Sequence, residues 1–157
     1  MESRDYNMKI GQKGLALIKE FEGWYSKPYL DPVGIATIGY GFTYYLPGRT
    51  KVTLKDKPLS KEEGAVMLID ILANYEKDVL RMVKKPLTQN QFDALVSFTY
   101  NLGGTNLSQS TLLKKVNKNP NDPSIATEFM KWVNAGGKPF SGLIRRRKAE
   151  AELYFTK

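Results

Sequence analysis

FEGWYSKPYLDPVGIATIGYGFT, residues 21–43, is a stretch in which Pro and Gly interrupt short β-branched and aromatic runs. This pattern is incompatible with a long helix and predicts a small hairpin or sheet over residues 26–43. The apolar side chains just before it repeat at helical spacing, so we expect a first helix over about 12–24. Glu22 falls on the apolar face of that helix, whereas Asp31 lies in the Pro- and Gly-rich segment. The sequence therefore predicts a helix that leads directly into a small β element.

The composition of the 157-residue chain limits the chemistry that these two carboxylates could support. With 41% hydrophobic and 25% charged residues, the chain is typical of a globular protein, and it is long enough to bury a core. It contains no Cys and no His, which excludes disulfides, thiolate zinc sites, Cys nucleophiles and His bases. Acid–base chemistry must therefore come from carboxylates, Tyr or Lys.

Capping signals and apolar periodicity predict helices over most of the remaining chain. Ser60 and Glu63 form a capping box ahead of a long apolar face, which predicts a helix over about 61–85. Thr88 and Gln91 form a second capping box ahead of what should be the most buried helix, which a glycine pair ends. Further helices are expected at about 110–118, 123–134 and 142–155, the second of them with Asp122 as its cap and Pro123 as its first residue.

These elements predict an α+β, mainly helical fold in a single domain over residues 1–157. We expect a small β-containing lobe over about 12–60, the long helix over about 61–85 as the connection, and a helical lobe over about 86–157. The N-terminal helix should pack near the helical lobe. The sequence contains no internal repeat, low-complexity tract or linker.

Glu22 and Asp31 have contrasting predicted environments. On an apolar helix face, desolvation would keep Glu22 protonated as a general acid. Beside polar and turn residues, Asp31 should stay ionised and could act on water or stabilise positive charge. Two carboxylates of this kind suit glycoside hydrolysis, but the spacing alone does not establish it, because few Glu–Asp pairs nine residues apart are catalytic.

The segment 21–43 as a whole resembles the phage-type lysozymes, glycoside hydrolase family twenty-four. In that family a Glu followed by Gly ends the first helix, an Asp lies nine residues on, and a Thr lies six residues beyond it, just before I-G-x-G. The matching positions here are Glu22, Asp31 and Thr37, followed by IGYG at 38–41. The resemblance continues in LTQNQFDALVSFTYNLG (87–103), STLLKKVN (110–117), FMKWVNAGGK (129–138) and GLIRRRKAE (142–150).

The resemblance implies a lysozyme-like fold and an endolysin, a muramidase that hydrolyses the β-1,4 bond between N-acetylmuramic acid and N-acetylglucosamine in bacterial peptidoglycan. Glu22 would be the general acid, and Asp31 and Thr37 would position and activate water. The resemblance implies inversion, which requires carboxyl groups about 6.5–9.5 Å apart. We expect neither a metal nor a cofactor.

Four further residues match positions near the sugar cleft of the family: Thr43, Tyr100, Asn101 and Ser110. Aromatic and amide groups can stack on saccharides and form hydrogen bonds with them. Tyr100 could equally be a core aromatic side chain, and for Ser110 a helix cap is the favoured interpretation. Gly39 and Gly41 are interpreted as residues that permit a tight turn.

Phe42 departs from the family, whose members commonly have a structural His after I-G-x-G. We therefore hypothesise that apolar packing by Phe42 replaces the stabilising contact of that His. The Glu22, Asp31 and Thr37 set is intact despite this difference.

A formal charge of +8 favours polyanionic partners. We expect attraction to the anionic cell envelope and no nucleic-acid binding, because aromatic residues such as Phe92, Phe129 and Trp132 fall on apolar helical stripes. The basic clusters, including residues 145–148, are interpreted as solvated helix faces. A basic nucleic-acid-binding protein and a catalytically silent peptidoglycan-binding domain remain alternatives.

The expected location follows from hydropathy. No apolar run approaches the length of a transmembrane helix, and the N-terminus lacks the apolar core of a signal peptide. We expect a monomer without stable membrane insertion, made in the cytoplasm of a bacterial host. It would reach peptidoglycan in the periplasm after a holin-type membrane lesion. A toxic domain of a bacteriocin is an alternative context.

Overall fold

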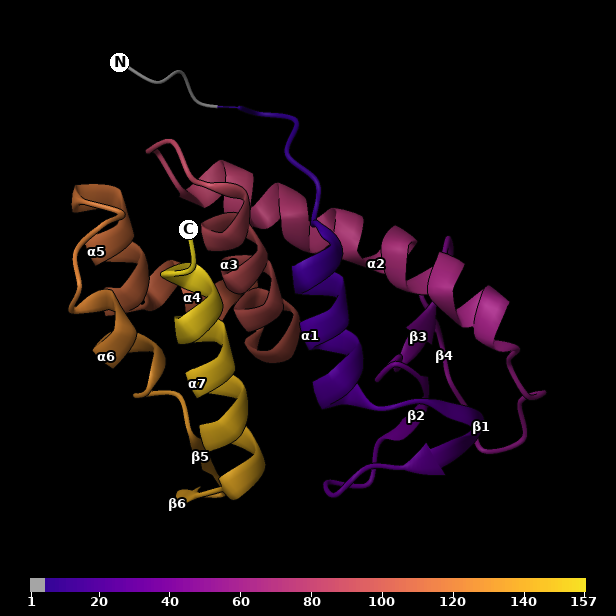
Figure 1. Cartoon of the computed structure of the whole chain (residues 1–157). Helices are drawn as coiled ribbons and strands as arrows, with labels where there is room; N and C mark the ends of the chain where they lie inside the picture. Colours follow the sequence, from indigo (N-terminus) through magenta and orange to yellow (C-terminus); the bar gives the residue numbers. More distant parts are fainter. Residues whose placement is uncertain (1–4) are drawn as a thin grey trace. The chain divides into compact units, whose positions relative to one another are not determined.

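The computed structural model describes residues 5–157 and has an α+β, mainly helical architecture, as predicted (Figure 1). The helices are α1 (Gln12–Glu22), α2 (Lys61–Met82), α3 (Gln89–Leu102), α4 (Gly104–Gln109), α5 (Thr111–Lys118), α6 (Ile125–Phe129) and α7 (Ser141–Tyr154). The strands form three antiparallel pairs: β1 (Tyr25–Leu30) with β2 (Ala36–Gly39), β3 (Tyr44–Tyr45) with β4 (Thr50–Lys51), and β5 (Asn134–Ala135) with β6 (Lys138–Pro139). Among residues 5–157, no helix is both long and apolar enough to cross a membrane.

The chain folds into two compact units. Residues 18–73 form the first, which we call the hairpin unit because it holds the β1–β2 and β3–β4 pairs. The second, which we call the helical unit, consists of the chain up to residue 17 together with residues 74–157. Helices α1 and α2 each contribute residues to both units, because the boundaries fall inside them.

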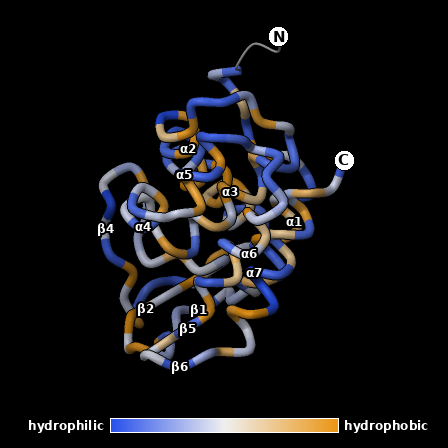
Figure 2. Tube along the Cα trace, turned by 90° about the vertical axis from the view of Figure 1, so that its left-hand side faces the viewer, coloured by the Kyte–Doolittle hydropathy of each residue, from blue (hydrophilic) through white to orange (hydrophobic). Residues whose placement is uncertain are grey.

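In the helical unit, the middle of α3 is buried on all sides, in agreement with the prediction of a deeply buried helix. Every residue from Gln91 to Thr99 is buried, and α3 carries hydrophobic stretches in Figure 2. Its capping box is present, because the Thr88 hydroxyl accepts from the Gln91 N–H and the Gln91 side chain accepts from the Thr88 N–H. At the other end, Gly103 has a φ of +90° and its N–H donates to the Thr99 carbonyl. The glycine pair then does more than end α3, since Gly104 begins the unpredicted helix α4.

The predicted helix over 123–134 is wrong in its length and its start. The structure has only α6, from Ile125 to Phe129, and Asp122 accepts hydrogen bonds from the N–H and hydroxyl of Ser124 instead of capping a helix that begins at Pro123. The chain then enters the short β5–β6 hairpin. Gly136 and Gly137 have φ values of +59° and +79°, which suit the tight turn of a two-residue hairpin and pull residues 134–139 out of helical geometry.

In the hairpin unit, the β1–β2 hairpin follows α1 directly. Tyr29 pairs with Thr37 and Leu30 with Ala36, so the turn between the strands contains Asp31. The capping box of Ser60 and Glu63 at the start of α2 is also present, with hydrogen bonds of 3.0 and 3.1 Å. The core of this unit is formed by apolar side chains that include Ile18, Ile38, Phe42, Leu68 and Leu72.

Candidate active site

Glu22 is the last residue of α1, and a glycine loop shapes its surroundings. Gly23, with a φ of +72°, follows the helix and donates its N–H to the Lys19 carbonyl. The half-buried carboxyl of Glu22 lies against Gly41, where a Cβ atom would overlap its Oε1. Gly41 has a φ of +82° and Gly39 one of +66°, which confirms that both glycines permit a tight turn. Gly41 therefore provides the space that the Glu22 carboxyl occupies.

Asp31 organises the turn of the β1–β2 hairpin. Its Oδ1 accepts hydrogen bonds from the N–H groups of Val33 (3.0 Å) and Ile35 (2.8 Å). Its backbone N–H donates to the Ile35 carbonyl, and its carbonyl accepts from the Gly34 N–H, both at 2.9 Å. These bonds hold the half-exposed carboxylate in one orientation while engaging Oδ1 and not Oδ2.

Thr37 lies on β2, and its buried side chain is joined to Asp31 through a single residue. The Thr37 hydroxyl donates to the Ile35 carbonyl at 2.9 Å, and the N–H of Ile35 donates to Asp31 Oδ1. A hydroxyl that donates its proton in this way has lone pairs left to accept a hydrogen bond. The structure therefore brings Asp31 and Thr37 together around Ile35.

Tyr29 lies beside the candidate site, as the cross-strand partner of Thr37, and the sequence analysis missed it. Burial raises the pKa of its phenol, and the negative charges of Tyr25, Glu22 and Asp31 raise it further. The phenol therefore lies within electrostatic reach of both candidate catalytic carboxylates. The sequence carried a partial signal, because a hairpin that turns at Asp31 brings Tyr29 opposite Thr37, the pairing that the structure has.

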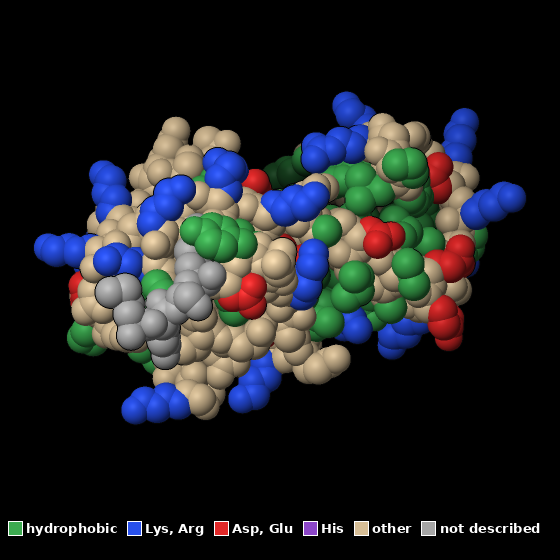
Figure 3. All heavy atoms as spheres, turned by 90° about the horizontal axis from the view of Figure 1, so that it is seen from above, with side chains coloured by type: hydrophobic (Ala, Val, Ile, Leu, Met, Phe, Trp, Pro, Cys, Tyr) green, Lys and Arg blue, Asp and Glu red, His purple; other side chains and the backbone are tan. Residues whose placement is uncertain are grey.

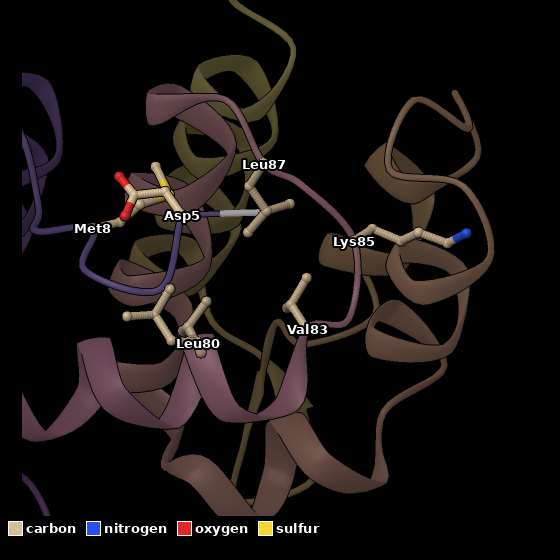
Figure 4. A pocket seen from close by; sticks show the side chains of 7 residues that line it. Asp5, Met8, Leu80, Val83, Lys85 and Leu87 are labelled. Atoms are coloured by element: carbon tan, nitrogen blue, oxygen red, sulfur yellow. The ribbon is translucent and has the colours of Figure 1, made fainter. Parts of the chain in front are cut away.

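Thr43 lines an open pocket of about 460 Å³ in the hairpin unit, together with Ile35, Tyr44, Arg49, Lys51 and Val52. This volume is in the range of small-ligand sites, about 300–1,000 Å³. Because the backbone of Ile35 forms hydrogen bonds with Asp31 and Thr37, the pocket borders the segment that positions these two candidate catalytic residues. The cavity of the helical unit shown in Figure 4 is much smaller, about 10 Å³, which is room for about one water molecule.

The other three predicted substrate-binding residues belong to the helical unit. Tyr100 is half-exposed and packs edge-on against Tyr75, with ring centroids 5.3 Å apart. Asn101 accepts a 2.7 Å hydrogen bond from Arg147 through its side-chain oxygen. Ser110 is buried and caps α5, with its hydroxyl accepting from the Leu113 N–H, as the favoured interpretation stated.

The basic run at residues 145–148 is only half a solvated helix face, because Arg145 and Lys148 are exposed, and the sequence interpretation is wrong for the two residues between them. Arg146 and Arg147 are buried, and both contact the buried carboxylate of Glu150. The i,i+4 and i,i+3 spacing of Arg146 and Arg147 from Glu150 allows this pairing within α7, but the charge pattern could not reveal that the cluster is buried, because burial depends on how α7 packs against α3. Elsewhere, Lys and Arg side chains are scattered over the visible face in Figure 3.

The hairpin unit thus holds a half-buried carboxyl at a helix end, and a carboxylate and a hydroxyl that both form hydrogen bonds with the backbone of Ile35. A carboxyl group can donate a proton, and a carboxylate beside a free lone pair can hold and deprotonate a water molecule. Among the reactions that need both, hydrolysis of a glycosidic bond uses two carboxyl groups in these roles.

Comparison with known proteins agrees with this chemistry. The family model for phage lysozyme matches residues 19–150. An endolysin of Acyrthosiphon pisum secondary endosymbiont phage 1 is 40% identical over 94% of this chain and 98% of its own length. The solved endolysin from Escherichia coli O157:H7 phage FAHEc1 is 35% identical, with a TM-score of 0.86 over 95% of this chain and 94% of its own. The muramidase domain of SpmX from Asticaccaulis excentricus is 34% identical, with a TM-score of 0.81 over 96% of this chain and 100% of its own. The chain therefore belongs to the phage lysozyme family and is a lysozyme-type peptidoglycan hydrolase.

Proposed function

We propose that this chain is an endolysin that cleaves the β-1,4 bond between N-acetylmuramic acid and N-acetylglucosamine and thereby lyses a bacterial host. The observation that carries the proposal is the Asp31–Ile35–Thr37 set of hydrogen bonds in the same compact unit as Glu22. The likeness to a solved muramidase domain supports the choice of bond.

In this proposal Glu22 is the general acid. Its carboxyl proton passes to the glycosidic oxygen as the bond between that oxygen and the anomeric carbon breaks. Asp31 accepts a proton from a water molecule, whose oxygen forms the new bond to the anomeric carbon. Thr37 accepts a hydrogen bond from the same water, because its own proton is committed to the Ile35 carbonyl. Attack from the face opposite the leaving group gives an inverted product with a new reducing end.

The test compares the wild-type chain with Glu22→Gln, using turbidity loss of purified peptidoglycan and mass spectrometry of the released fragments. Gln cannot donate the proton, so we expect the rate to fall about a thousandfold. Glu20→Gln is the matched control, because Glu20 is exposed on the same helix two residues earlier, and it should keep the wild-type rate.

Three results would count against the assignment. Near-normal lysis by Glu22→Gln would remove Glu22 as the acid. Fragments that lack muramic acid at their new reducing ends would show that a different bond is cleaved. Sedimentation of the wild-type chain with cell walls without release of fragments would instead identify a silent binding domain.

We also propose that the positive charge assists the encounter with the anionic wall, which the chain reaches through a holin-type lesion. Such attraction is screened by salt, so wall binding should weaken as ionic strength rises. A gel shift with nucleic acid at moderate salt would favour the other class of polyanionic partner. We expect the active species to be a monomer, which sedimentation velocity tests.

A further inference from the structure

The pocket that Thr43 lines, which we call the basic pocket, contains two basic side chains that the proposed hydrolysis does not use. It lies between the turn of the β1–β2 hairpin, which contributes Ile35, and the β3–β4 hairpin, which contributes Tyr44, Arg49 and Lys51. Its volume of about 460 Å³ is large enough for several heavy-atom groups of a ligand.

Two cations are arranged around one aromatic ring in this pocket. Lys51 is the direct cross-strand partner of Tyr44, so both side chains project from the same face of the hairpin. The guanidinium carbon of Arg49 lies 5.3 Å from the centroid of the Tyr44 ring, a distance that allows a cation–π interaction. Tyr44 therefore lies beside both positive charges and limits the positions that the Arg49 guanidinium can adopt.

The nearby carboxylate of Asp56 is occupied elsewhere. It accepts hydrogen bonds from the Tyr45 hydroxyl and from the N–H and hydroxyl of Thr53. Tyr45 follows Tyr44 in the strand and so points to the opposite face. Within the described residues, 5–157, the lining of the basic pocket includes no acidic side chain, so its two cations face the pocket without an opposing charge from its walls.

The position of the pocket relates it to the proposed substrate. Ile35 lines the pocket, and its backbone forms hydrogen bonds with both Asp31 and Thr37. A ligand in the pocket is therefore separated from the proposed water-activating pair by this single residue. A muramic acid unit carries a lactyl-linked peptide, and that peptide contains free carboxylates and short alkyl groups. The apolar walls of Ile35 and Val52 suit the alkyl groups, and a guanidinium with an ammonium suits a carboxylate.

We propose that the basic pocket binds a carboxylate of the peptide stem of peptidoglycan and makes the enzyme prefer glycan strands that still carry their peptides. This inference rests on the proposed muramidase function. Arg49 and Lys51 are specificity-determining residues in it, and neither takes part in the transfer of protons.

The test uses Arg49→Gln and Lys51→Gln on two substrates, soluble glycan strands with intact peptides and the same strands after amidase has removed the peptides. Loss of a hydrogen bond to a charged group corresponds to about a tenfold change in affinity. We expect each variant to raise KM for the peptide-bearing strands about tenfold, with kcat little changed and no change on the stripped strands. Lys57→Gln is the matched control, because Lys57 is an exposed cation of the same unit outside the pocket lining.

A second measurement does not depend on turnover. Isothermal titration calorimetry measures binding of a peptide-bearing muramyl disaccharide to the full chain carrying Glu22→Gln, with and without Arg49→Gln. We expect Arg49→Gln to weaken binding about tenfold. If neither kind of strand is hydrolysed, the proposed function is wrong. The titration still tests whether the basic pocket binds the peptide stem.

Equal effects of the pocket variants on both kinds of strand would overturn the proposal, as would the same KM change in Lys57→Gln. So would unchanged binding of the disaccharide in the calorimeter.

Discussion

The hairpin unit and the helical unit use charged side chains in opposite ways. In the hairpin unit, Glu22 and Asp31 are partly exposed, and backbone groups position them. The turn at Gly41 makes room for the Glu22 carboxyl, and two backbone N–H groups donate to Asp31. In the helical unit, Glu150 and Arg147 have no exposed side-chain surface and contact each other. The difference shows that burial alone does not identify chemically active charges in this chain, because its most buried ones are neutralised by partners.

The buried cluster consists of Glu150, Arg146, Arg147 and Ser97. Glu150 Oε2 accepts from the Ser97 hydroxyl at 2.5 Å and from Arg146 Nε at 3.3 Å, while Oε1 lies 2.9 Å from Arg147 Nε. Burial raises the pKa of Glu150, and the charges of Arg147 and Arg146 oppose that rise. The charges pair within α7, the hydrogen bonds to Ser97 join this helix to α3, and the paired charges are unavailable for catalysis.

The largest effect on stability should come from breaking this cluster with Glu150→Gln. The change removes the carboxylate charge that both buried guanidinium groups contact, and we expect a loss of about 3–5 kcal/mol in the free energy of unfolding. Urea denaturation measures it. Glu152→Gln, at an exposed position of the same helix, should change little. Equal stability of the two variants would contradict the role assigned to the cluster.

The next effect concerns the geometry of the hairpin unit. In Gly41→Ala the new methyl group overlaps the Glu22 carboxyl, and displacement of a catalytic group by about 1 Å can cost about a hundredfold in rate. Gly137→Ala controls for backbone strain, because its φ of +79° is close to the +82° of Gly41 and a Cβ there meets no atom within 4 Å. Both variants should lose some stability, but only Gly41→Ala should lose hydrolytic rate in the fragment-release assay.

Phe42→His tests whether the hairpin unit depends on apolar packing where the family commonly has His. The Phe42 side chain is 1% exposed and packs edge-on against Tyr40. A buried imidazole without a suitable partner should cost about 1–3 kcal/mol, so the melting temperature should fall. Phe140→His, at an exposed ring, is the control. A melting temperature that stays the same or rises would refute the packing hypothesis.

The smallest effect is expected for Glu128→Gln in the helical unit. The hydrogen bond from Lys115 lowers the pKa of Glu128, and Lys131 adds to this effect. A lowered pKa means that the stabilisation is present above the unfolded-state value of about 4.5 and is lost as the pH falls through the folded-state value. Since both lysines are partly exposed, we expect about 1 kcal/mol at neutral pH.

Thermal unfolding from pH 3 to pH 7 measures this difference. Wild type and Glu128→Gln should differ in melting temperature above about pH 5 and converge in acid. The exposed Glu62 gives the control variant Glu62→Gln, which should follow the wild-type curve. A difference that instead grew as the pH fell would have the wrong sign for this ion pair.

Local signals predicted the helices best. The capping boxes of Ser60 with Glu63 and Thr88 with Gln91 are present because each needs only residues three apart. The hairpin at 134–139 was missed because helical periodicity was extended to residue 134, although Gly136-Gly137 is itself a hairpin signal.

For this protein, sequence by itself determined the α+β class, the start of α2, both ends of α3, the exclusion of His and Cys chemistry, and the candidates Glu22, Asp31 and Thr37. Tertiary structure decided which charges are buried, as for Arg147, and what surrounds the candidates, as for Tyr29 and Gly41. The physical reason is range. Caps, turns, periodicity and pairs such as Arg147 with Glu150 at i,i+3 depend on neighbours along the chain, whereas desolvation depends on side chains that only the folded chain brings together.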